Sequence, residues 1–467
     1  MAHMEQERNK RLFKDIIIYG IGNIGSRFLS ILLLPLLSFF WEREDTGYYN
    51  LALSAILFLI PVITLQMRES TFRLLIDNND NTYRKNILST TFFIQSGVFL
   101  SILIISFIVP LFFNIRYFCL IVISLYVYSF YEIYLQVVRI IYSASKFAYM
   151  SIITSFLTVV LSLGLIFAFK MGIEGLFIGN IIARITSVAI IELPKRLLFT
   201  YLSLNCIKKE YIRDILSYSL PMLLTAVSFG VITNSGKFIV SEILGLQENG
   251  DLALSENFVS IIIILGVSFY QAWQVTAVKN YKEKDSSAFF SEVFNKYAVL
   301  LSLLVILISF GLRSFSFILI DEKYIQTVDI TFLYGAGAMF YCFAVFLEII
   351  YHCTKQTTKI LYSILTCAII TPILSYVMIK QFGLMGNVAA YCISFAYLFF
   401  FRYFQTKKTL PIQIKKGFIF SLMSLIASGI LFYFTHNTII DYSVLFIAAI
   451  LLLYVLSASR KYIRQKK

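Results

Sequence analysis

The feature of this sequence that most limits its fold is a series of long, uninterrupted apolar stretches. Most are about 20 residues or longer, which is the length a helix needs to cross the roughly 30 Å hydrocarbon core of a membrane. Each stretch is apolar throughout rather than at alternate positions, so helices are favoured over the strands of a membrane barrel. A helix also satisfies its own backbone hydrogen bonds in lipid. The sequence therefore predicts an all-α polytopic membrane protein.

Fourteen transmembrane helices are expected from these stretches. The composition agrees, because 59% of the 467 residues are hydrophobic and 14% are charged, whereas soluble domains have about 45–50% apolar and 25% charged residues. The expected spans are 15–40, 48–67, 87–113, 117–139, 147–169, 173–192, 214–241, 252–275, 292–312, 328–352, 360–379, 384–404, 417–435 and 442–459.

Charged residues indicate how the spans are oriented. The chain has 40 Lys and Arg against 26 Asp and Glu, a formal net charge of +14. With the N-terminus inside, roughly 30 of the basic residues fall in inner loops and about six in outer loops, as the positive-inside rule expects. The basic excess is therefore assigned to loops beside anionic lipid, and no nucleic-acid partner is expected. An even number of spans places both termini in the cytoplasm.

Three short matches indicate an internal repeat. Six spans in each copy is an even number, so the copies have the same orientation, which predicts two parallel six-helix lobes related by an axis along the membrane normal. The matching pairs are 170–175 (KMGIEG) with 380–386 (KQFGLMG), 145–149 (SKFAY) with 358–362 (TKILY), and 46–47 (TG) with 249–250 (NG), each offset by roughly 210 residues.

The repeat and the loops give an expected domain organisation. Spans 1–6 form an N-lobe, spans 7–12 form a C-lobe, and two extra C-terminal helices follow. The first four residues look like an expression-vector remnant. The segments are a cytoplasmic N-terminus 1–14, the N-lobe 15–192, a cytoplasmic linker 193–213, the C-lobe 214–406, spans 13 and 14 in 407–459, and a basic cytoplasmic tail 460–467.

A glycine motif lies inside the first span. Gly20, Gly22 and Gly25, with Asn23 between them, match the dinucleotide-binding pattern G-x-G-x-x-G. That pattern acts between a strand and a helix of a βαβ unit, so a nucleotide site is rejected here. One interpretation is close helix packing through small residues. The alternative is a flexible or locally unwound segment that lines a cavity or acts as a hinge.

Four basic residues are expected within or at the ends of spans: Arg27, Arg68, Arg184 and Lys237. A charge at the membrane centre costs at least about 2.5–3.5 kcal/mol, so it usually faces a cavity or a partner. Arg27 is about twelve residues into span 1 and therefore roughly 18 Å deep. These four residues are the candidates for binding an anionic substrate.

Each cation also has a structural interpretation that stays open. Arg68 lies at the inner end of span 2, where its side chain can reach the membrane surface. Arg184 is near the middle of span 6, where Glu132 or Glu174 can form a structural ion pair with it. Lys237 lies toward the outer end of span 7, and Glu242 is its expected neutralising partner.

Acidic residues at depth are few. Glu132 and Glu256 are the best placed, and Glu348 lies near an inner end. A structural pair with a basic residue is the first interpretation for Glu132 and Glu256. Binding of a coupling ion, Na+ or H+, is the second.

Enzyme and metal signatures are absent from the sequence. The H-E-x-x-H, G-x-S-x-G and P-loop motifs do not occur. The six cysteines show no C-x-x-C pairing, so neither a zinc site nor another metal site is expected. No loop between expected spans exceeds about 20 residues, which is too short for a soluble catalytic domain. The sequence therefore predicts a transporter without a bound cofactor.

The span-1 sequence from Tyr19 to Arg27, followed by Leu32–Pro35, resembles the first span of Wzx-type polysaccharide flippases. The resemblance continues through Asp45–Leu51 and Arg68–Arg73, and then through Asn234–Lys237 in span 7. The Gly-x-x-Gly openings of spans 6 and 12 also fit, and about the first 410 residues are covered. The family often has an Asp-Arg pair where this chain has Gly236 and Lys237, so a role that depends on that acid is in doubt.

The resemblance implies the multidrug/oligosaccharidyl-lipid/polysaccharide exporter fold, with two six-helix lobes around a central cavity that Asn234 helps to line. It also implies a bacterial inner-membrane flippase. The cargo would be an undecaprenyl-pyrophosphate-linked oligosaccharide for O-antigen, capsule or a related polymer, moved by alternating access. The lipid-linked oligosaccharide and membrane lipids are then its partners, together with assembly proteins such as a polymerase or a chain-length regulator. Arginine suits the pyrophosphate because guanidinium binds oxyanions bidentately.

Three alternatives remain. A cation-coupled multidrug exporter has the same fold but is expected to have acids deep in its cavity, and span 1 has none beyond Asp15 at its entrance. A lipid II flippase also has fourteen spans, whereas the opening motifs are more like those of the Wzx group. A membrane polysaccharide polymerase or ligase would need a larger outer loop than any found here.

Overall fold

The computed structural model describes residues 31, 33–76, 80–283, 285–354, 356–435 and 437–465. The regular elements within these ranges are helices, and twelve of those helices are long and apolar enough to cross a membrane. The all-α polytopic fold is therefore confirmed. Most of the expected first span, residues 15–30, lies outside the described residues, so the total of fourteen spans stays a prediction.

The helices group into two units, each with its own core. Unit 1 is built from 52–230 and unit 2 from 34–51 together with the chain from 231 onward. Helix α2 (Arg43–Ile63) and helix α9 (Lys209–Ile243) each begin in one unit and end in the other. This grouping differs from the lobes expected from the repeat, whose boundaries remain predictions.

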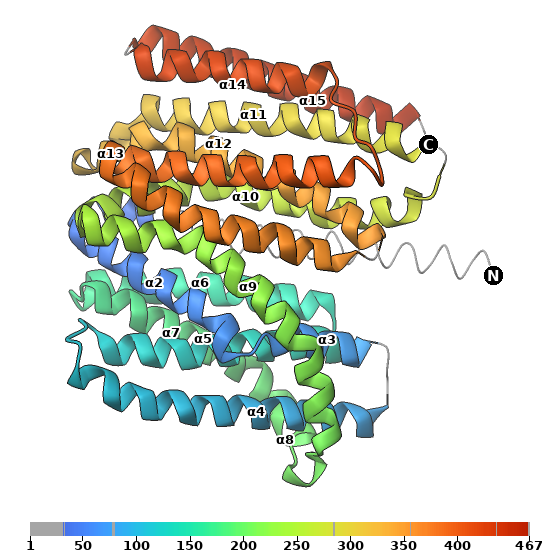
Figure 1. The fold of residues 1–467 in the computed structure, drawn as a ribbon. Helices are drawn as coiled ribbons and strands as arrows, with labels where there is room; N and C mark the ends of the chain where they lie inside the picture. The colour runs from blue at the N-terminus through green and yellow to red at the C-terminus, as the bar shows by residue number, and fades with distance from the viewer. Residues whose placement is uncertain are drawn as a thin grey trace. The chain divides into compact units, whose positions relative to one another are not determined.

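Unit 1 is centred on α5, whose residues Ile133, Tyr134 and Val137 are fully buried. Helices α5 and α6 both pack against α7. Figure 1 shows these helices in blue-green, with α4 and α8 beside them. The elements are α3 (Met67–Ile76), α4 (Asn81–Ile108), η1 (Val109–Leu111), α5 (Phe118–Ile141), α6 (Ala144–Ala168), α7 (Ile173–Lys195), α8 (Leu197–Tyr201) and η2 (Leu204–Cys206).

Unit 2 is built around α12, which is the most buried of its helices (Figure 1). An aromatic core lies on one face of α12, where Phe346 stacks against Trp273 at 5.4 Å and Tyr297 at 5.8 Å between ring centroids. Helices α14 and α15 pack against α11. The elements are α10 (Leu246–Asn280), α11 (Ser286–Leu319), η3 (Glu322–Tyr324), α12 (Gln326–Cys353), α13 (Thr357–Thr406), α14 (Lys416–Phe434) and α15 (Thr438–Gln465).

Helix α13 carries both of the spans expected at 360–379 and 384–404. Gly383 interrupts it with φ 59° and ψ −138°, a conformation that favours glycine. Three residues later, a Cβ on Gly386 would overlap the carbonyl of Met378. The chain therefore reverses at Gly383, and the two halves of α13 form a helical hairpin. The sequence match at 170–175 also lies in a hairpin, between α6 and α7.

The expected span 48–67 is wrong at both ends. Helix α2 begins at Arg43 and ends at Ile63, and Met67 already belongs to α3. Leu65 and Gln66 lie between them with φ of 47° and 52°. The left-handed conformation is disfavoured for residues with a side chain. Leu65 and Met67 flank Gln66 in this turn, so average hydropathy stays high enough to hide the break.

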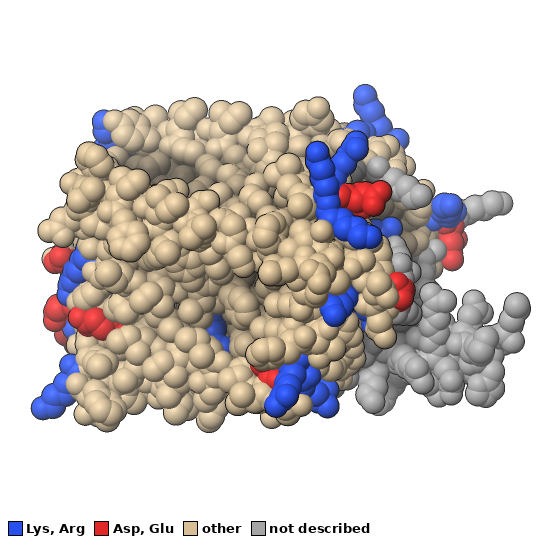
Figure 2. Space-filling view, turned by 90° about the horizontal axis from the view of Figure 1, so that it is seen from below, with Lys and Arg blue, Asp and Glu red and all other residues tan. Residues whose placement is uncertain are grey.

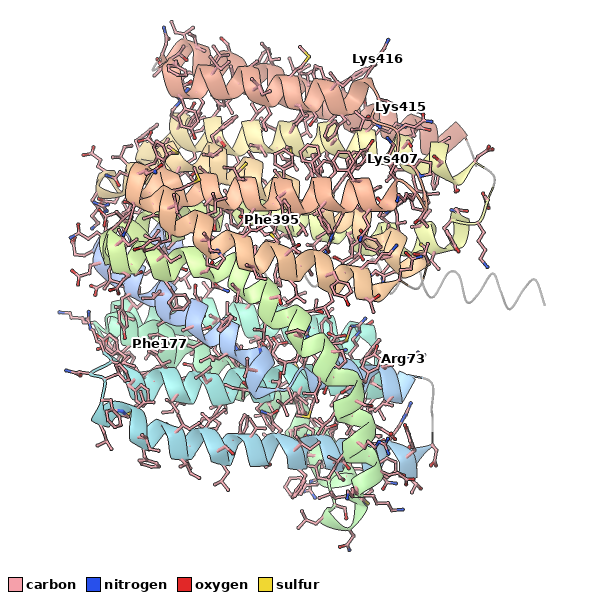
Figure 3. All side chains as sticks on the ribbon, viewed as in Figure 1. Arg73, Phe177, Phe395, Lys407, Lys415 and Lys416 are labelled. Atoms are coloured by element: carbon pink, nitrogen blue, oxygen red, sulfur yellow. The ribbon has the colours of Figure 1, made fainter. Side chains whose placement is uncertain are left out.

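The surface is consistent with membrane insertion. On the face shown in Figure 2, residues other than Lys, Arg, Asp and Glu make up most of the surface. Lys407, Lys415 and Lys416 lie at the same end of unit 2, around the α13–α14 connection (Figure 3). This largely uncharged surface, the twelve long apolar helices and the basic connection agree with a multi-pass membrane protein.

Candidate functional site

Arg68 is held by two carboxylates in unit 1. It lies in the first turn of α3, directly after the left-handed turn. Its Nη1 donates to Glu132 Oε2 on α5 at 2.8 Å, and its Nη2 donates to Glu69 Oε1 at 3.0 Å. The Arg68 side chain is 40% exposed. Glu132 is therefore paired with Arg68, and an anionic ligand would compete with two carboxylates for this guanidinium.

Arg184 projects from the middle of α7 and has a different environment. Its Nη1 donates to Asn180 Oδ1 at 2.9 Å, and its guanidinium carbon lies 3.4 Å from the centroid of the Tyr128 ring. Its Nε is buried without a hydrogen-bond partner in the described part of the chain. Stacking on an aromatic face stabilises a cation without neutralising it. These contacts therefore give Arg184 no negatively charged partner.

The ion pairs expected for Arg184 do not form in this structure. Glu132 instead binds Arg68, and Glu174 lies in the first turn of α7, well away from the middle of the helix. The position of Arg184 near the middle of an expected span was sufficient to single it out. It was insufficient to select a partner, because Tyr128 and Asn180 are common helix residues with no charge to signal their role.

Lys237 in unit 2 is paired with an acid of the neighbouring helix. Its Nζ is 2.7 Å from Glu256 Oε2 and 2.8 Å from Glu256 Oε1 on α10, and its side chain is 7% exposed. The expected partner Glu242 is therefore replaced by Glu256. A lysine so deeply buried requires a counter-charge, and Glu256 on the adjacent helix supplies it within the membrane.

The surroundings of Lys237 explain the missing acid at position 236. A Cβ on Gly236 would overlap Oδ1 of Asn387, so the amide of Asn387 occupies the space where a side chain at 236 would lie. Asn234, one turn away, donates from Nδ2 to Thr233 Oγ1 at 3.1 Å. The remaining space beside Lys237 is about 10 Å³, close to the minimum for a single water molecule.

One buried cation escaped the sequence reasoning. Arg402 is 1% exposed and donates to Glu348 Oε2 at 2.8 Å, to the Ala344 carbonyl at 2.9 Å and to Ser363 Oγ at 3.1 Å. His352 Nε2 lies 3.6 Å from the other carboxylate oxygen of Glu348. Arg402 is close to the end of an expected span, where an arginine usually reaches the membrane surface. The available signal was Glu348, an acid near the inner end of an expected span on the neighbouring helix α12.

Two further ion pairs hold unit 2 together. Arg43, expected in the loop before span 2, lies in α2 and pairs with the buried Asp251 of α10. Arg313 of α11 pairs with Asp441 of α15 and also donates to the carbonyl of Phe432. Both pairs join segments distant in sequence, so spacing along the chain could not indicate them.

Some expected site residues cannot be placed. Arg27, Gly20, Gly22, Asn23 and Gly25 all lie outside the described residues. Among the residues that are described, no group of three or more His, Cys, Asp or Glu side chains is arranged to hold a metal ion.

Solved structures of similar architecture define the class. A structure described as lipid II flippase MurJ in an inward closed conformation superimposes with a TM-score of 0.75 at 18% identity, covering 96% of this chain and 99% of that one. An inward-facing multidrug resistance MATE family transporter of the MOP superfamily gives 0.67 at 13% identity, covering 88% and 95%. A MOP superfamily transporter from Pyrococcus furiosus gives 0.60 at 12%, covering 89% and 96%. The protein therefore has the MOP-superfamily fold.

The family follows from the sequence itself. The sequence model of the family described as polysaccharide biosynthesis protein matches residues 12–273, more than half of the chain. The chain belongs to this family. The resemblance to Wzx-type flippases is thus confirmed at the level of family and superfamily. No curated protein matches the sequence.

Proposed function

We propose that the protein is a flippase for lipid-linked oligosaccharides. The cargo is an undecaprenyl-pyrophosphate-linked sugar unit, moved from the cytoplasmic to the outer leaflet of the bacterial inner membrane, with both termini cytoplasmic. The product would serve O-antigen, capsule or a related polysaccharide. Membership of the polysaccharide biosynthesis family and the fold shared with a lipid II flippase support this assignment.

The observation that carries the proposal is that Arg184 has no acidic partner among the described residues. A cation at the centre of a membrane helix is costly unless it is paired or serves a ligand. Arg184 is stabilised by the Tyr128 ring and by Asn180, neither of which has a negative charge. A pyrophosphate crossing the membrane would supply the missing charge. Arginine also offers a pyrophosphate two parallel hydrogen bonds.

The other candidate cations have different roles in this proposal. Arg27 and Arg68 receive the pyrophosphate during alternating access, and Glu132 holds Arg68 when substrate is absent. Lys237 remains part of the substrate site only if Glu256 releases it. Release of either acid would be the step at which Na+ or H+ binds, if transport is ion-coupled. A polymerase or chain-length regulator would act on the exported product.

Reconstituted vesicles test the proposal. A fluorescent undecaprenyl-pyrophosphate-linked sugar is placed in both leaflets, and a membrane-impermeant quencher is added outside. Wild type should make inner-leaflet label accessible to the quencher, and Arg184→Gln should slow this by at least roughly tenfold, because a charge-assisted hydrogen bond contributes about 1.5–3 kcal/mol. Arg116→Gln, at an exposed arginine, is the matched control. Equal rates with and without protein would refute the flippase.

A cation-coupled multidrug exporter is the second candidate, because a MATE family transporter shares the fold. That function requires acids free to bind a cation, whereas Glu132 and Glu256 are both held by basic residues. Efflux of a cationic dye from the same vesicles, lost in Glu132→Gln or Glu256→Gln, would favour the exporter over the flippase.

A further inference from the structure

The α7–α9 connection, residues 193–213, combines exposed apolar side chains with exposed basic ones. The side chains of Leu193, Phe199 and Leu204 are 77%, 83% and 80% exposed. The connection contains one acid, Glu210. Its five basic residues, all exposed, are Lys195, Arg196, Lys208, Lys209 and Arg213. Large apolar side chains that gather on an exposed segment indicate that the segment contacts lipid or another molecule.

The backbone of this connection is packed against unit 1. Helix α8 buries Leu197 in the core of the unit, so Phe199, two residues later, points to the opposite side of the helix. Helix α8 and η2 both pack against α4 (Figure 1). The Ser89 hydroxyl of α4 donates to the Tyr201 carbonyl at 2.9 Å and accepts from the Ser203 amide at 2.9 Å. The exposure of Phe199 is therefore a consequence of the fold of the segment.

The basic side chains of the connection are not neutralised by the protein. None of the five forms an ion pair with an acid in the part of the chain that the structure describes. Glu192, the acid that precedes them in the sequence, accepts from the Leu198 amide at 2.9 Å and from the Tyr134 hydroxyl at 3.1 Å. The five cations are thus available to anions of a neighbouring surface.

A second basic connection, between α13 and α14, differs in its apolar residues. Lys415 and Lys416 are exposed there, as the basic residues of the α7–α9 connection are. Its Leu410 and Ile412 are buried, however, and Ile414 is 38% exposed. Basic inner loops are general among membrane proteins. The apolar side chains held outward therefore distinguish the α7–α9 connection from an ordinary basic loop.

The position of the connection favours lipid as the molecule that it contacts. Helix α7 ends at Lys195 and α9 begins at Lys209, and both helices are long and apolar enough to cross a membrane. The connection therefore lies near the membrane surface, where apolar side chains reach acyl chains while lysine and arginine stay among head groups. Five basic residues against one acid complement acidic head groups better than zwitterionic ones.

We propose that the α7–α9 connection is a binding surface for acidic phospholipids. Leu193, Phe199 and Leu204 enter the leaflet on this side, which is the cytoplasmic leaflet in the orientation proposed above. The basic side chains bind the lipid phosphates. Helix α9 begins within this surface, so bound lipid holds its first turn at the membrane. The inference does not depend on the identity of the cargo.

Quenching of tryptophan fluorescence by brominated lipids tests the surface. The full-length variant Leu204→Trp is reconstituted in vesicles of phosphatidylcholine and phosphatidylglycerol, with bromine on the acyl chains of one lipid or the other. Trp41 and Trp273 are buried, and the wild-type signal is subtracted. The tryptophan at position 204 should be quenched. The relative binding constant should favour phosphatidylglycerol over phosphatidylcholine by at least about threefold.

Charge variants of the same protein provide the control. Lys208→Gln/Lys209→Gln should at least halve the preference for phosphatidylglycerol. Lys415→Gln/Lys416→Gln, in the α13–α14 connection, should leave it unchanged. High salt should also lower the preference, because it screens exposed charges.

Two results would overturn the inference. Absence of quenching at position 204 by either lipid would show that the connection does not contact the acyl chains. Equal quenching by the two lipids, or a preference that Lys208→Gln/Lys209→Gln does not change, would show that the basic residues do not select acidic lipid.

Discussion

Gly47 and Gly250 pack against each other's helices with backbone in contact with backbone. A Cβ on Gly47 would overlap the carbonyl of Leu246 and approach the amide nitrogen of Gly250 at 2.9 Å, and a Cβ on Gly250 would overlap the carbonyl of Arg43. Each glycine is the fifth residue of its helix, Gly47 in α2 and Gly250 in α10. The contact is therefore reciprocal. The two glycines are also one of the matches from which the sequence predicts a repeat.

Polar contacts surround this crossing. Arg43 pairs with Asp251, which follows Gly250, and Asn249 Nδ2 donates to the Gly47 carbonyl at 3.1 Å. Thr46 Oγ1 lies 2.7 Å from the hydroxyl of Tyr324. Close approach of the backbones brings these short side chains within reach of one another, so the glycines and the polar contacts depend on each other.

Substitution of Gly250 by Ala should destabilise the protein. The added Cβ would collide with the backbone of α2, which cannot move without disturbing the Arg43–Asp251 pair. We expect a loss of about 1–3 kcal/mol, measured as a lower midpoint of thermal unfolding in detergent. Gly97→Ala in α4 is the control, because nothing lies within 4 Å of its added Cβ. A Gly250 variant as stable as the control would contradict the proposed crossing.

Removal of the Arg402 charge should be more damaging than removal of the whole pair. Arg402→Met leaves the partly buried Glu348 without its arginine partner, which should cost up to about 3–5 kcal/mol. The double variant Arg402→Met/Glu348→Met should recover much of this loss, because no uncompensated charge remains. Thermal unfolding of Arg402→Met, Glu348→Met and the double variant gives the coupling free energy between the two residues. Additive effects would show that the pair is not a unit.

A glycine at position 66 should fit the turn between α2 and α3 without loss of stability. Gln66 has φ 52°, which disfavours a side chain, and glycine adopts this conformation without strain. Gln66→Gly should therefore leave stability unchanged or raise it by up to about 1 kcal/mol. Gln66→Val should lower it, since a β-branched residue is least tolerated there. If both substitutions reduce the unfolding midpoint equally, the side chain of Gln66 matters more than its backbone.

Glu132 should compete with substrate for Arg68. In the structure the Glu132 carboxylate binds the guanidinium that we propose for the pyrophosphate. Glu132→Gln should therefore strengthen binding of undecaprenyl pyrophosphate, by roughly fivefold or more if the coupling exceeds about 1 kcal/mol. Binding to nanodiscs containing the variant measures this, with Glu292→Gln on α11 as the control, because the Glu292 side chain is 42% exposed and pairs with Lys296 instead of Arg68. Weaker binding by Glu132→Gln would make the pair structural instead.

Hydropathy predicted the fold better than the site. Long apolar runs reveal membrane helices because a helix must have about 20 apolar residues to cross the membrane. Such a run can be recognised directly in the sequence. The break at Leu65–Gln66 was missed because the hydropathy of a segment does not report its backbone angles. The lobe boundaries remain predictions, since α2 and α9 are divided between the contact-based units.

Ion-pair partners were harder to predict than ion-pair members. Lys237, Arg184 and Glu256 were found from their positions within expected spans. For Lys237 the sequence indicated Glu242, five residues along the chain, whereas packing brings Glu256 of the next helix to it. Arg402 was overlooked because its distance from the end of a span was compatible with reaching the surface. Partner choice depends on helix rotation, which the sequence of a continuously apolar segment does not reveal.

The Arg313–Asp441 pair has a consequence for how the chain is made. Arg313 of α11 emerges from the ribosome long before Asp441 of α15. Until α15 enters the membrane, Arg313 lacks the carboxylate of Asp441, and an arginine without a counter-charge in a membrane helix costs up to about 2.5–3.5 kcal/mol. A chain cut after α14 would leave Arg313 without this carboxylate, and we expect such a chain to be less stable than one that contains α15.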